Sequence, residues 1–282
     1  MSAESTLPIT VCIPAKDEER NLVECINCLQ KSFAKVVVVD SGSTDETPRL
    51  AREAGAELID FQWNGQFPKK RNWFLRHHRP ETEWVLFLDA DERVTPEFIA
   101  ELHKTLPTTT HNGFWLPFQN WFMGRQLKHG DPFRKLALFR VSAGEYERFD
   151  EDWWSHLDME VHEHPVLQGT VGELKSPLEH HEFHGLHRYI AKHNEYSTWE
   201  ARRWEWFQTQ GQEAWNELTP RQKTKYQNLD KWWLCWAYFL VSYVLKKGFL
   251  DGEAGFVFAS MKRRYFSDIR RKIREGKESL AK

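Results

Sequence analysis

Asp89 and Asp91 stand one residue apart, directly after the apolar run 84–88. Two carboxylates at that spacing suit a hard divalent cation such as Mg²⁺ or Mn²⁺, which takes oxygen ligands and often binds through one or two carboxylates plus substrate phosphates. By itself, a D-x-D pair is more often a solvated acidic turn. The pair therefore predicts metal-assisted phosphate chemistry only where further site residues accompany it.

The surrounding sequence alternates short apolar runs with amphipathic stretches, which is typical of βαβ units around a mostly parallel sheet. The four consecutive valines 36–39 are β-branched, which predicts a strand buried on both faces. The expected strands are 9–14, 36–39, 58–61 and 84–88. The fold class is therefore α/β, with a mostly parallel central sheet.

Helix-start signals follow three of these strands. Asp17 is the expected N-cap of a helix over 22–29, and residues 43–46 (STDE) have the pattern of a capping box. Gly55 is expected to end that second helix. Thr95-Pro96 predicts another helix, with proline at its first position.

The carboxyl ends of these strands are acidic, and in open parallel sheets ligands bind beyond those ends. Asp17 follows the first expected strand, Asp40 follows the second, and Asp89 and Asp91 follow the fourth. The sequence has no G-x-G-x-x-G after the first strand and no G-x-x-x-x-G-K-[ST]. A dinucleotide site and a P-loop are therefore not expected.

Four linked motifs occur in order: 14–18 (PAKDE), 39–45 (VDSGSTD), 70–72 (KRN) and 88–92 (LDADE). Together they resemble the nucleotide-sugar half of family 2 glycosyltransferases, over roughly residues 8–107. The resemblance implies a GT-A fold, which is Rossmann-like, and a nucleotide-sugar donor.

The resemblance also assigns roles within the donor site. It implies that Asp17 and Asp40 lie around the uracil and ribose, that Asp91 coordinates Mg²⁺ or Mn²⁺, and that Asp89 contacts ribose or metal. A carboxylate can accept hydrogen bonds from a base edge or a ribose diol, whereas a diphosphate needs cations. The metal, Lys70 and Arg71 would supply these cations. The alternative for Lys70 and Arg71 is that they lie on a solvated helix face. The implied donor site comprises Pro14, Ala15, Asp17, Asp40, Ser41, Lys70, Arg71, Asp89, Ala90 and Asp91.

Further motifs occur in the second half: 159–163 (MEVHE), 177–180 (PLEH) and 247–252 (KGFLDG). They resemble the subgroup that includes bacterial lipopolysaccharide core β-glucosyltransferases. The resemblance implies that Glu163 is the base that removes the acceptor proton. Its rivals for that role are the neighbouring acids Asp150, Glu151, Asp152, Asp158 and Glu160.

Histidine and tryptophan near Glu163 supply candidates for the remaining contacts. His180 is a candidate third metal ligand, with a structural histidine as the alternative. Trp153, Trp154 and His162 are candidates for the acceptor site. Aromatic faces suit the apolar face of a sugar ring, and they also suit an ordinary core.

Residues 1–110 are expected to form the nucleotide-sugar-binding half, 111–185 the acceptor-binding and catalytic half, and 186–282 a helical C-terminal extension. Within the extension, 232–245 carries no charge; as a helix it would be about 21 Å long, short of the ~30 Å hydrocarbon core. Residues 262–277 contain eight basic and two acidic side chains. This combination is typical of a segment lying on an anionic membrane. A buried helix with a solvated basic tail is the alternative.

The charge balance gives no electrostatic reason to bind nucleic acid, because 39 Lys and Arg oppose 41 Asp and Glu, for a net charge of −2. Residues 1–8 have neither a basic n-region nor a long apolar core, so no signal peptide is expected. The expected location is the cytoplasm, with peripheral contact to the inner face of the cytoplasmic membrane.

The motifs and their resemblance predict an inverting, metal-dependent glycosyltransferase. It would transfer a sugar from a nucleotide-sugar, a UDP-sugar, to a hydroxyl of a saccharide or lipid-linked acceptor in lipopolysaccharide-type cell-envelope biosynthesis. The alternatives are a sugar nucleotidyltransferase and a catalytically inactive carbohydrate-binding scaffold of the same fold.

Overall fold

The computed structural model describes residues 6–29, 31–148, 157–160, 163–181 and 185–280. Its contacts divide the chain into two compact units. Unit 1 comprises residues 1–120 and 133–182, and unit 2 comprises residues 121–132 and 183–282. The expected division into a donor half (1–110), an acceptor half (111–185) and a helical extension (186–282) stays a prediction. Both expected halves fall largely within unit 1.

Unit 1 is built on a twisted sheet whose first four strands are parallel neighbours in the order β3-β2-β1-β4. They are β1 (Leu7–Ala15), β2 (Phe33–Asp40), β3 (Glu57–Asp60) and β4 (Trp84–Phe87). These are the four strands expected from the sequence, and the α/β class is confirmed. In β2, Val38 packs into one apolar cluster while Val37 and Val39 pack into another, so the strand is buried on both faces.

The sheet continues beyond β4 with mixed strand directions, in the order β8-β6-β12-β5. β8 (Phe133–Arg140) runs antiparallel to both β4 and β6 (Gly113–Phe122). The remaining strands are β5 (Glu92–Arg93), β7 (Arg125–Leu127), β11 (Val171–Glu173) and β12 (Leu178–His180), with β9 (Gly144–Tyr146) and β10 (Pro165–Leu167) as a separate antiparallel pair.

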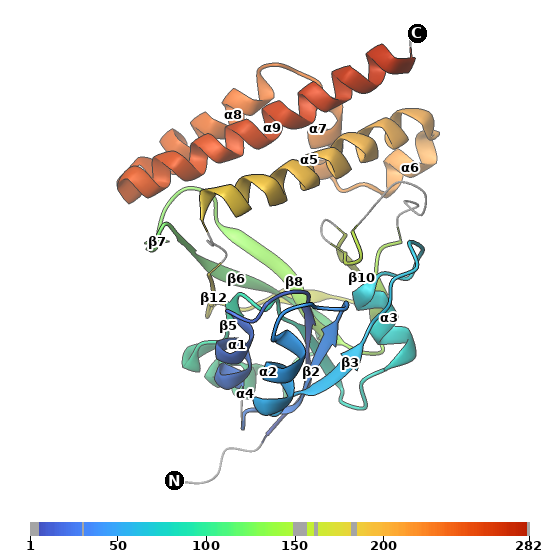
Figure 1. Ribbon diagram of the computed structural model, residues 1–282, viewed down its shortest axis with the longest axis vertical. Helices are drawn as coiled ribbons and strands as arrows, with labels where there is room; N and C mark the ends of the chain where they lie inside the picture. Colours follow the sequence, from blue (N-terminus) through green and yellow to red (C-terminus); the bar gives the residue numbers. More distant parts are fainter. Residues whose placement is uncertain (1–5, 30, 149–156, 161–162, 182–184, 281–282) are drawn as a thin grey trace. The chain divides into compact units, whose positions relative to one another are not determined.

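The helices of unit 1 cover the two faces of this sheet (Figure 1). One apolar cluster includes residues of α1 and α4, and the other includes Phe74 and Leu75 of α3. The helices are α1 (Leu22–Leu29), α2 (Thr47–Glu53), α3 (Lys70–His77) and α4 (Pro96–Thr105). Thr95 caps α4 by accepting from the Phe98 N–H at 3.2 Å, as expected.

Two expected helix caps are wrong. Asp17 lies five residues before α1, in a left-handed conformation with φ of 53°. The capping box at 43–46 does not form, because α2 begins at Thr47 and its N-cap residue Glu46 makes no side-chain cap. Asp17 and Ser43 instead link the two loops to each other: Ser43 Oγ accepts the Asp17 N–H and Asp17 Oδ1 accepts the Thr44 N–H.

Unit 2 is helical, apart from the 121–132 segment that contains β7. Its two long helices, α5 (Leu186–Thr209) and α9 (Gly252–Leu280), lie side by side, and α8 (Leu234–Leu240) also packs on α9 (Figure 1). Between α8 and α9 the chain forms a π-helical turn (Val241–Leu245) and a 3₁₀ turn (Gly248–Asp251). Two short helices, α6 (Gln212–Glu217) and α7 (Pro220–Asn228), complete the unit.

None of the helices in the described part of the chain is both long and apolar enough to cross a membrane.

Candidate active site

The sheet order places the expected site residues at a topological switch point. The chain leaves β1 toward β2 and β3 on one side, and returns to β4 on the other side of β1. Ala15 of β1 pairs with Asp40 of β2, and Cys12 of β1 pairs with Phe87 of β4, so the loops after these strands meet at one sheet edge. Such an edge is where open α/β sheets bind ligands.

The loops after β1 and β2 are locked together by Asp17, Asp40 and Ser43. The buried Asp40 carboxylate accepts hydrogen bonds from the Ser43 N–H at 2.9 Å and from the Ser43 hydroxyl. Ser43 Oγ accepts the Asp17 N–H at 2.8 Å, and Asp17 Oδ1 accepts the Thr44 N–H at 2.8 Å. The two expected nucleoside-binding acids therefore also shape the loops that carry them.

Ser41 lies at the same edge, and its N–H donates to the Ala15 carbonyl at 3.1 Å. Its hydroxyl oxygen is buried and has no hydrogen-bond partner among the residues that the structure describes. Because buried hydroxyls are nearly always paired, an unpaired one at a ligand-binding edge is an available contact for a polar ligand.

Three consecutive cations, Lys69, Lys70 and Arg71, are buried at the start of α3. The interpretation of Lys70 and Arg71 as a solvated helix face is therefore wrong. Each cation has its own carboxylate partner. Burial lowers the pKa of Lys70, and the nearby Asp158 opposes that shift. The ion pairs are Lys69–Glu163 at 3.0 Å, Lys70–Asp158 at 3.3 Å and Arg71–Asp89 at 2.7 Å.

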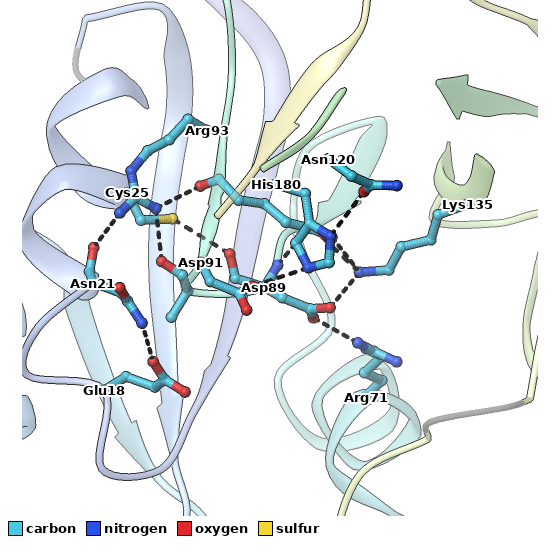
Figure 2. A network of polar contacts seen from close by, with 12 residues as sticks. Glu18, Asn21, Cys25, Arg71, Asp89, Asp91, Arg93, Asn120, Lys135 and His180 are labelled. Carbon is cyan, nitrogen blue, oxygen red and sulfur yellow. Dashed lines mark hydrogen bonds and ion pairs between the residues drawn. The ribbon is translucent and has the colours of Figure 1, made fainter. Parts of the chain in front are cut away.

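Asp89 is the centre of a charged network at the end of β4 (Figure 2). Its Oδ1 lies 2.7 Å from Arg71 Nη2, and its Oδ2 lies 2.7 Å from Lys135 Nζ. Lys135 also lies 3.2 Å from Glu92, whose other carboxylate oxygen accepts the Asp89 N–H at 2.9 Å. Burial, opposed in part by Lys135, raises the pKa of Glu92 to about 7.

Asp91 and His180 face each other beside this network (Figure 2). His180 Nε2 lies 3.7 Å from Asp91 Oδ1, and its Nδ1 lies 3.2 Å from Asn120 Oδ1. The ring is also stacked on Phe133. Asn120 and Phe133 therefore orient the imidazole so that its second nitrogen points toward Asp91.

The Asp91–His180 pair fits a divalent cation that completes its shell with phosphate oxygens. Carboxylate and imidazole are suitable ligands for Mn²⁺, and a site that shares its metal with a diphosphate needs few protein ligands. Asp89 fits less directly, since both its oxygens contact cations. Within the described ranges, no group of three or more His, Cys, Asp or Glu side chains could hold a metal ion.

Glu163, the expected base, is buried beside Lys69. Its rival Glu160 is also buried, and its two carboxylate oxygens accept the N–H groups of Arg71 at 2.9 Å and Asn72 at 3.1 Å. Burial raises the pKa of Glu160, and Arg71 opposes that rise. Glu160 thus binds the amino end of α3, which is a structural task.

Several expected residues lie outside the described part of the chain. They are the acceptor candidates Trp153, Trp154 and His162 and the rival acids Asp150, Glu151 and Asp152.

Three residues of the network were not predicted from the sequence: Lys69, Glu92 and Lys135. Lys69 adjoins the expected KRN motif and Glu92 adjoins the D-x-D, so their positions were a usable signal. Lys135 had no such signal. It comes from β8, and only the antiparallel pairing of β8 with β4 brings it to Asp89.

A family model for glycosyl transferase family 2 matches residues 10–160, which include both loop acids, the three cations and the D-x-D. The chain belongs to glycosyl transferase family 2. It is a glycosyltransferase, as the motifs predicted, and membership of this family favours that activity over a sugar nucleotidyltransferase or an inactive scaffold.

Curated relatives of this family 2 enzyme include proteins of different lengths. A TPR repeat-containing protein of Synechococcus elongatus is 34% identical over 98 residues, which cover 35% of this chain and 24% of that protein. The lipopolysaccharide core biosynthesis glycosyltransferase LpsC of Rhizobium meliloti is 29% identical over 204 residues, which cover 69% of this chain and 71% of LpsC.

Solved structures similar to this family 2 enzyme include glucosyl-3-phosphoglycerate synthase from Mycobacterium tuberculosis in complex with Mn²⁺, UDP and glucosyl-3-phosphoglycerate. The sequence identity is 25%, the match covers 43% of this chain and 46% of that chain, and the TM-score is 0.32.

Proposed function

We propose that this glycosyltransferase uses a UDP-sugar and a divalent cation, Mg²⁺ or Mn²⁺, and transfers the sugar with inversion to a hydroxyl of a saccharide or glycolipid acceptor. One observation supports the proposal above the others. The loops after β1, β2 and β4 bring Ser41, Asp40 and the D-x-D to one sheet edge, beside the buried cations at the start of α3.

The nucleoside would bind at the ends of β1 and β2. Pro14 and Ala15 form the end of β1, and Asp17, Asp40 and the unpaired hydroxyl of Ser41 supply polar contacts there. Carboxylates accept hydrogen bonds from the N–H of a uracil edge and from ribose hydroxyls, which suits these side chains to that end of the donor.

The diphosphate would bind between the amino end of α3 and the end of β4. Lys70 and Arg71 supply positive charge, and Asp91 and His180 would hold the metal, with Asp89 and Ala90 at the ribose side. When bound, the metal stabilises the charge of the leaving diphosphate. Arg71 can share its guanidinium between Asp89 and a phosphate oxygen, because it has five N–H donors.

Glu163 would accept the proton of the attacking hydroxyl. One-step attack at the anomeric carbon passes through an oxocarbenium-like transition state and inverts the configuration, as in other displacements at glycosidic carbons. The Lys69 ammonium lies 3.0 Å from Glu163 Oε1, and a neighbouring positive charge favours the carboxylate form that a base requires. Acceptor contacts are assigned to Trp153, Trp154 and His162, which lie outside the described residues.

The acceptor proposal rests on the relatives and on composition. LpsC is named for lipopolysaccharide core biosynthesis, which supports a cell-envelope saccharide or glycolipid acceptor. We place the enzyme in the cytoplasm, in peripheral contact with the inner face of the membrane, because such an acceptor is assembled on lipid.

Calorimetric titration with UDP tests the donor and metal assignments. We expect binding in the presence of Mn²⁺ that is lost in EDTA and at least tenfold weaker in Asp91→Asn. Glu97→Gln, which removes an exposed carboxylate of α4, is the matched control and should bind as the wild type does. Metal-independent binding, or equal binding by Asp91→Asn, would contradict the metal site.

The base is tested separately with Glu163→Gln. We expect transfer to fall at least ~100-fold, with UDP affinity changed less than twofold, because general-base catalysis typically contributes 10²–10⁴. The anomeric configuration of the product, read by NMR, tests inversion. Unchanged transfer by Glu163→Gln would return the role of base to its rivals.

A further inference from the structure

The helical unit carries a concentrated set of exposed large apolar side chains. Thirteen such side chains are exposed in the described part of the chain, and ten of them lie between residues 232 and 256. Trp232 is 67% exposed and Leu245 is 73% exposed. We call these ten the apolar ridge: Trp232, Trp233, Trp236, Leu240, Val241, Val244, Leu245, Phe249, Leu250 and Phe256.

Helical spacing and ring contacts connect several residues of the apolar ridge. Trp236, Leu240 and Val244 recur every four residues, so they lie along one side of α8 and the π-helical turn. Half-buried rings connect this stripe to the start of α9. Phe239 contacts Trp236 and Tyr243, and Tyr243 contacts both Phe249 and Phe256.

The ridge is presented by a well-packed helix. The opposite side of α8 buries Leu234 and Cys235, and Tyr238 stacks on Phe266 of α9 with ring centroids 3.8 Å apart. α8 therefore has apolar residues on both sides, one against α9 and one toward solvent. Side chains of this size are left exposed on that scale mainly where another apolar phase covers them.

Basic side chains border the ridge. Lys231 precedes it, and Lys246 and Lys247 interrupt it after Leu245; all three are exposed. The guanidinium of Arg263 lies over the Trp236 ring, with its Cζ 4.4 Å from the ring centroid. This arrangement of tryptophans, aliphatic side chains and bordering lysines complements an anionic phospholipid surface, where rings enter the headgroup boundary and ammonium groups meet phosphates.

We propose that the apolar ridge is a docking surface for a bilayer of anionic phospholipids. This proposal rests on the proposed function, because it names the surface that makes the membrane contact. Its separate evidence is the exposed apolar side chains of the ridge and the basic side chains beside them. A second copy of this chain is the alternative occupant, and the bordering lysines favour the bilayer because they complement anionic headgroups. At about 21 Å for residues 232–245, the segment is suited to lying on the bilayer.

Flotation of the full chain with vesicles tests the proposal. The probes are vesicles of phosphatidylcholine with 30% phosphatidylglycerol, and of phosphatidylcholine alone. We expect the wild type to float with the anionic vesicles at low salt, and the double variant Trp236→Glu/Leu240→Glu to bind them at least tenfold less. Val166→Glu/Leu186→Glu, at two exposed apolar positions outside the ridge, is the matched control and should bind as the wild type does.

A charge variant separates the two parts of the surface. Lys231→Glu/Lys247→Glu should lose most of the preference for phosphatidylglycerol, because each basic side chain near an anionic surface strengthens binding roughly fivefold. Circular dichroism confirms that each variant is folded. The UDP affinity of the same variants should equal that of the wild type. A wrong donor assignment would therefore appear in the UDP titration, and a wrong membrane surface would appear only in vesicle binding.

Three outcomes would overturn the proposal. The first is wild-type protein that does not float with anionic vesicles, and the second is binding that Trp236→Glu/Leu240→Glu leaves unchanged. The third is a wild-type dimer in sedimentation velocity that ignores vesicles and that the same variant converts to monomer, which would assign the ridge to a second copy of the chain.

Discussion

At the scale of residues, the site is defined by buried charges that neutralise one another. Asp89 contacts two cations, and each of the three cations at the start of α3 contacts its own carboxylate. A buried pair is costly to break, because the remaining partner keeps its desolvation penalty without compensation. Single substitutions here should therefore affect stability as well as ligand binding.

Lys135→Met tests whether the charged network around Asp89 stabilises the fold. Lys135 is the network cation that had no signal in the sequence. The variant removes a counter-charge that Asp89 and the buried Glu92 share. We expect a loss of about 3 kcal/mol in the free energy of unfolding, measured in urea. The control is Lys35→Met, which breaks an exposed ion pair with Glu57 and should cost less than about 1 kcal/mol. Equal losses in the two variants would contradict the argument.

Glu92 predicts a pH dependence of stability. Below about pH 4.5 it is protonated in both the folded and the unfolded chain, whereas between 4.5 and about 7 only the folded chain keeps the proton. The folded state then binds more protons, so its stability falls as pH rises through that window, by up to ~1.4 kcal/mol per pH unit. Glu92→Gln should flatten this slope in urea unfolding between pH 5 and 7.5, and the exposed Glu97→Gln should not. An identical slope in wild type and Glu92→Gln would refute the assignment.

At this scale the sequence indicated the carboxylates but not how they are paired. Asp89, Asp91 and Asp40 could be located because each follows an apolar run at a strand end. Their partners depend on which strands and loops become neighbours. Lys135 is 46 residues from Asp89, and Glu163 is 94 residues from Lys69. No local pattern encodes such distances.

At the scale of elements, the four strands were predictable, whereas of the three expected helix starts only the one at Thr95 forms as predicted. Runs such as the four valines of β2 form strands because burial on both faces requires uninterrupted apolar residues. The polar residues Asp17 and Ser43 match helix-cap patterns, yet Ser43 Oγ accepts the Asp17 N–H and Asp17 Oδ1 accepts the Thr44 N–H, both at 2.8 Å, which links the β1 and β2 loops. A hydrogen-bonding residue near a helix start satisfies whichever backbone group lies closest, and here that group belongs to another loop.

Asn72 tests how α3 is fixed to the rest of unit 1. Its side chain donates to the Tyr146 carbonyl and accepts the Tyr146 N–H, both at 2.9 Å, and this joins α3 to β9. Asn72→Ala leaves two buried backbone groups without partners, each costing about 1–3 kcal/mol. We expect a loss of at least about 2 kcal/mol in urea unfolding, together with weaker UDP binding, because the cations of α3 lose their support.

The exposed Asn27→Ala on α1 is the control for this variant, and it should lie within about 0.5 kcal/mol of the wild type. Stability equal to the wild type in Asn72→Ala would show that the α3–β9 contact does not position the site.

At the scale of the whole molecule, the two units are interleaved in sequence. Most of strand β6 belongs to unit 1, the next segment, residues 121–132, belongs to the helical unit 2, and β8 belongs to unit 1 again. Phe122 packs there with Tyr189 and Ala254, in an apolar cluster of unit 2. The expectation of a helical extension from residue 186 placed a boundary near 185, and the sequence gave no sign that residues 121–132 belong to the helical unit, because twelve residues are too few to show a pattern of their own.

This interleaving predicts what truncation does. A chain that ends at residue 182 keeps the described donor-site residues but loses the helices that cover Phe122, so it should bind the dye ANS and self-associate. Replacing residues 121–132 with Asn-Gly in that fragment should restore a monomer, because it removes Phe122 and leaves a four-residue loop (119, 120 and the inserted pair) between Phe118 and Phe133, which pair across β6 and β8. Sedimentation velocity and UDP titration measure both effects. A monomeric 1–182 fragment would show that Phe122 does not need the C-terminal helices to cover it. If the fragment with residues 121–132 replaced fails to bind UDP with Mn²⁺ while the full chain binds it, the helical unit contributes to the donor site.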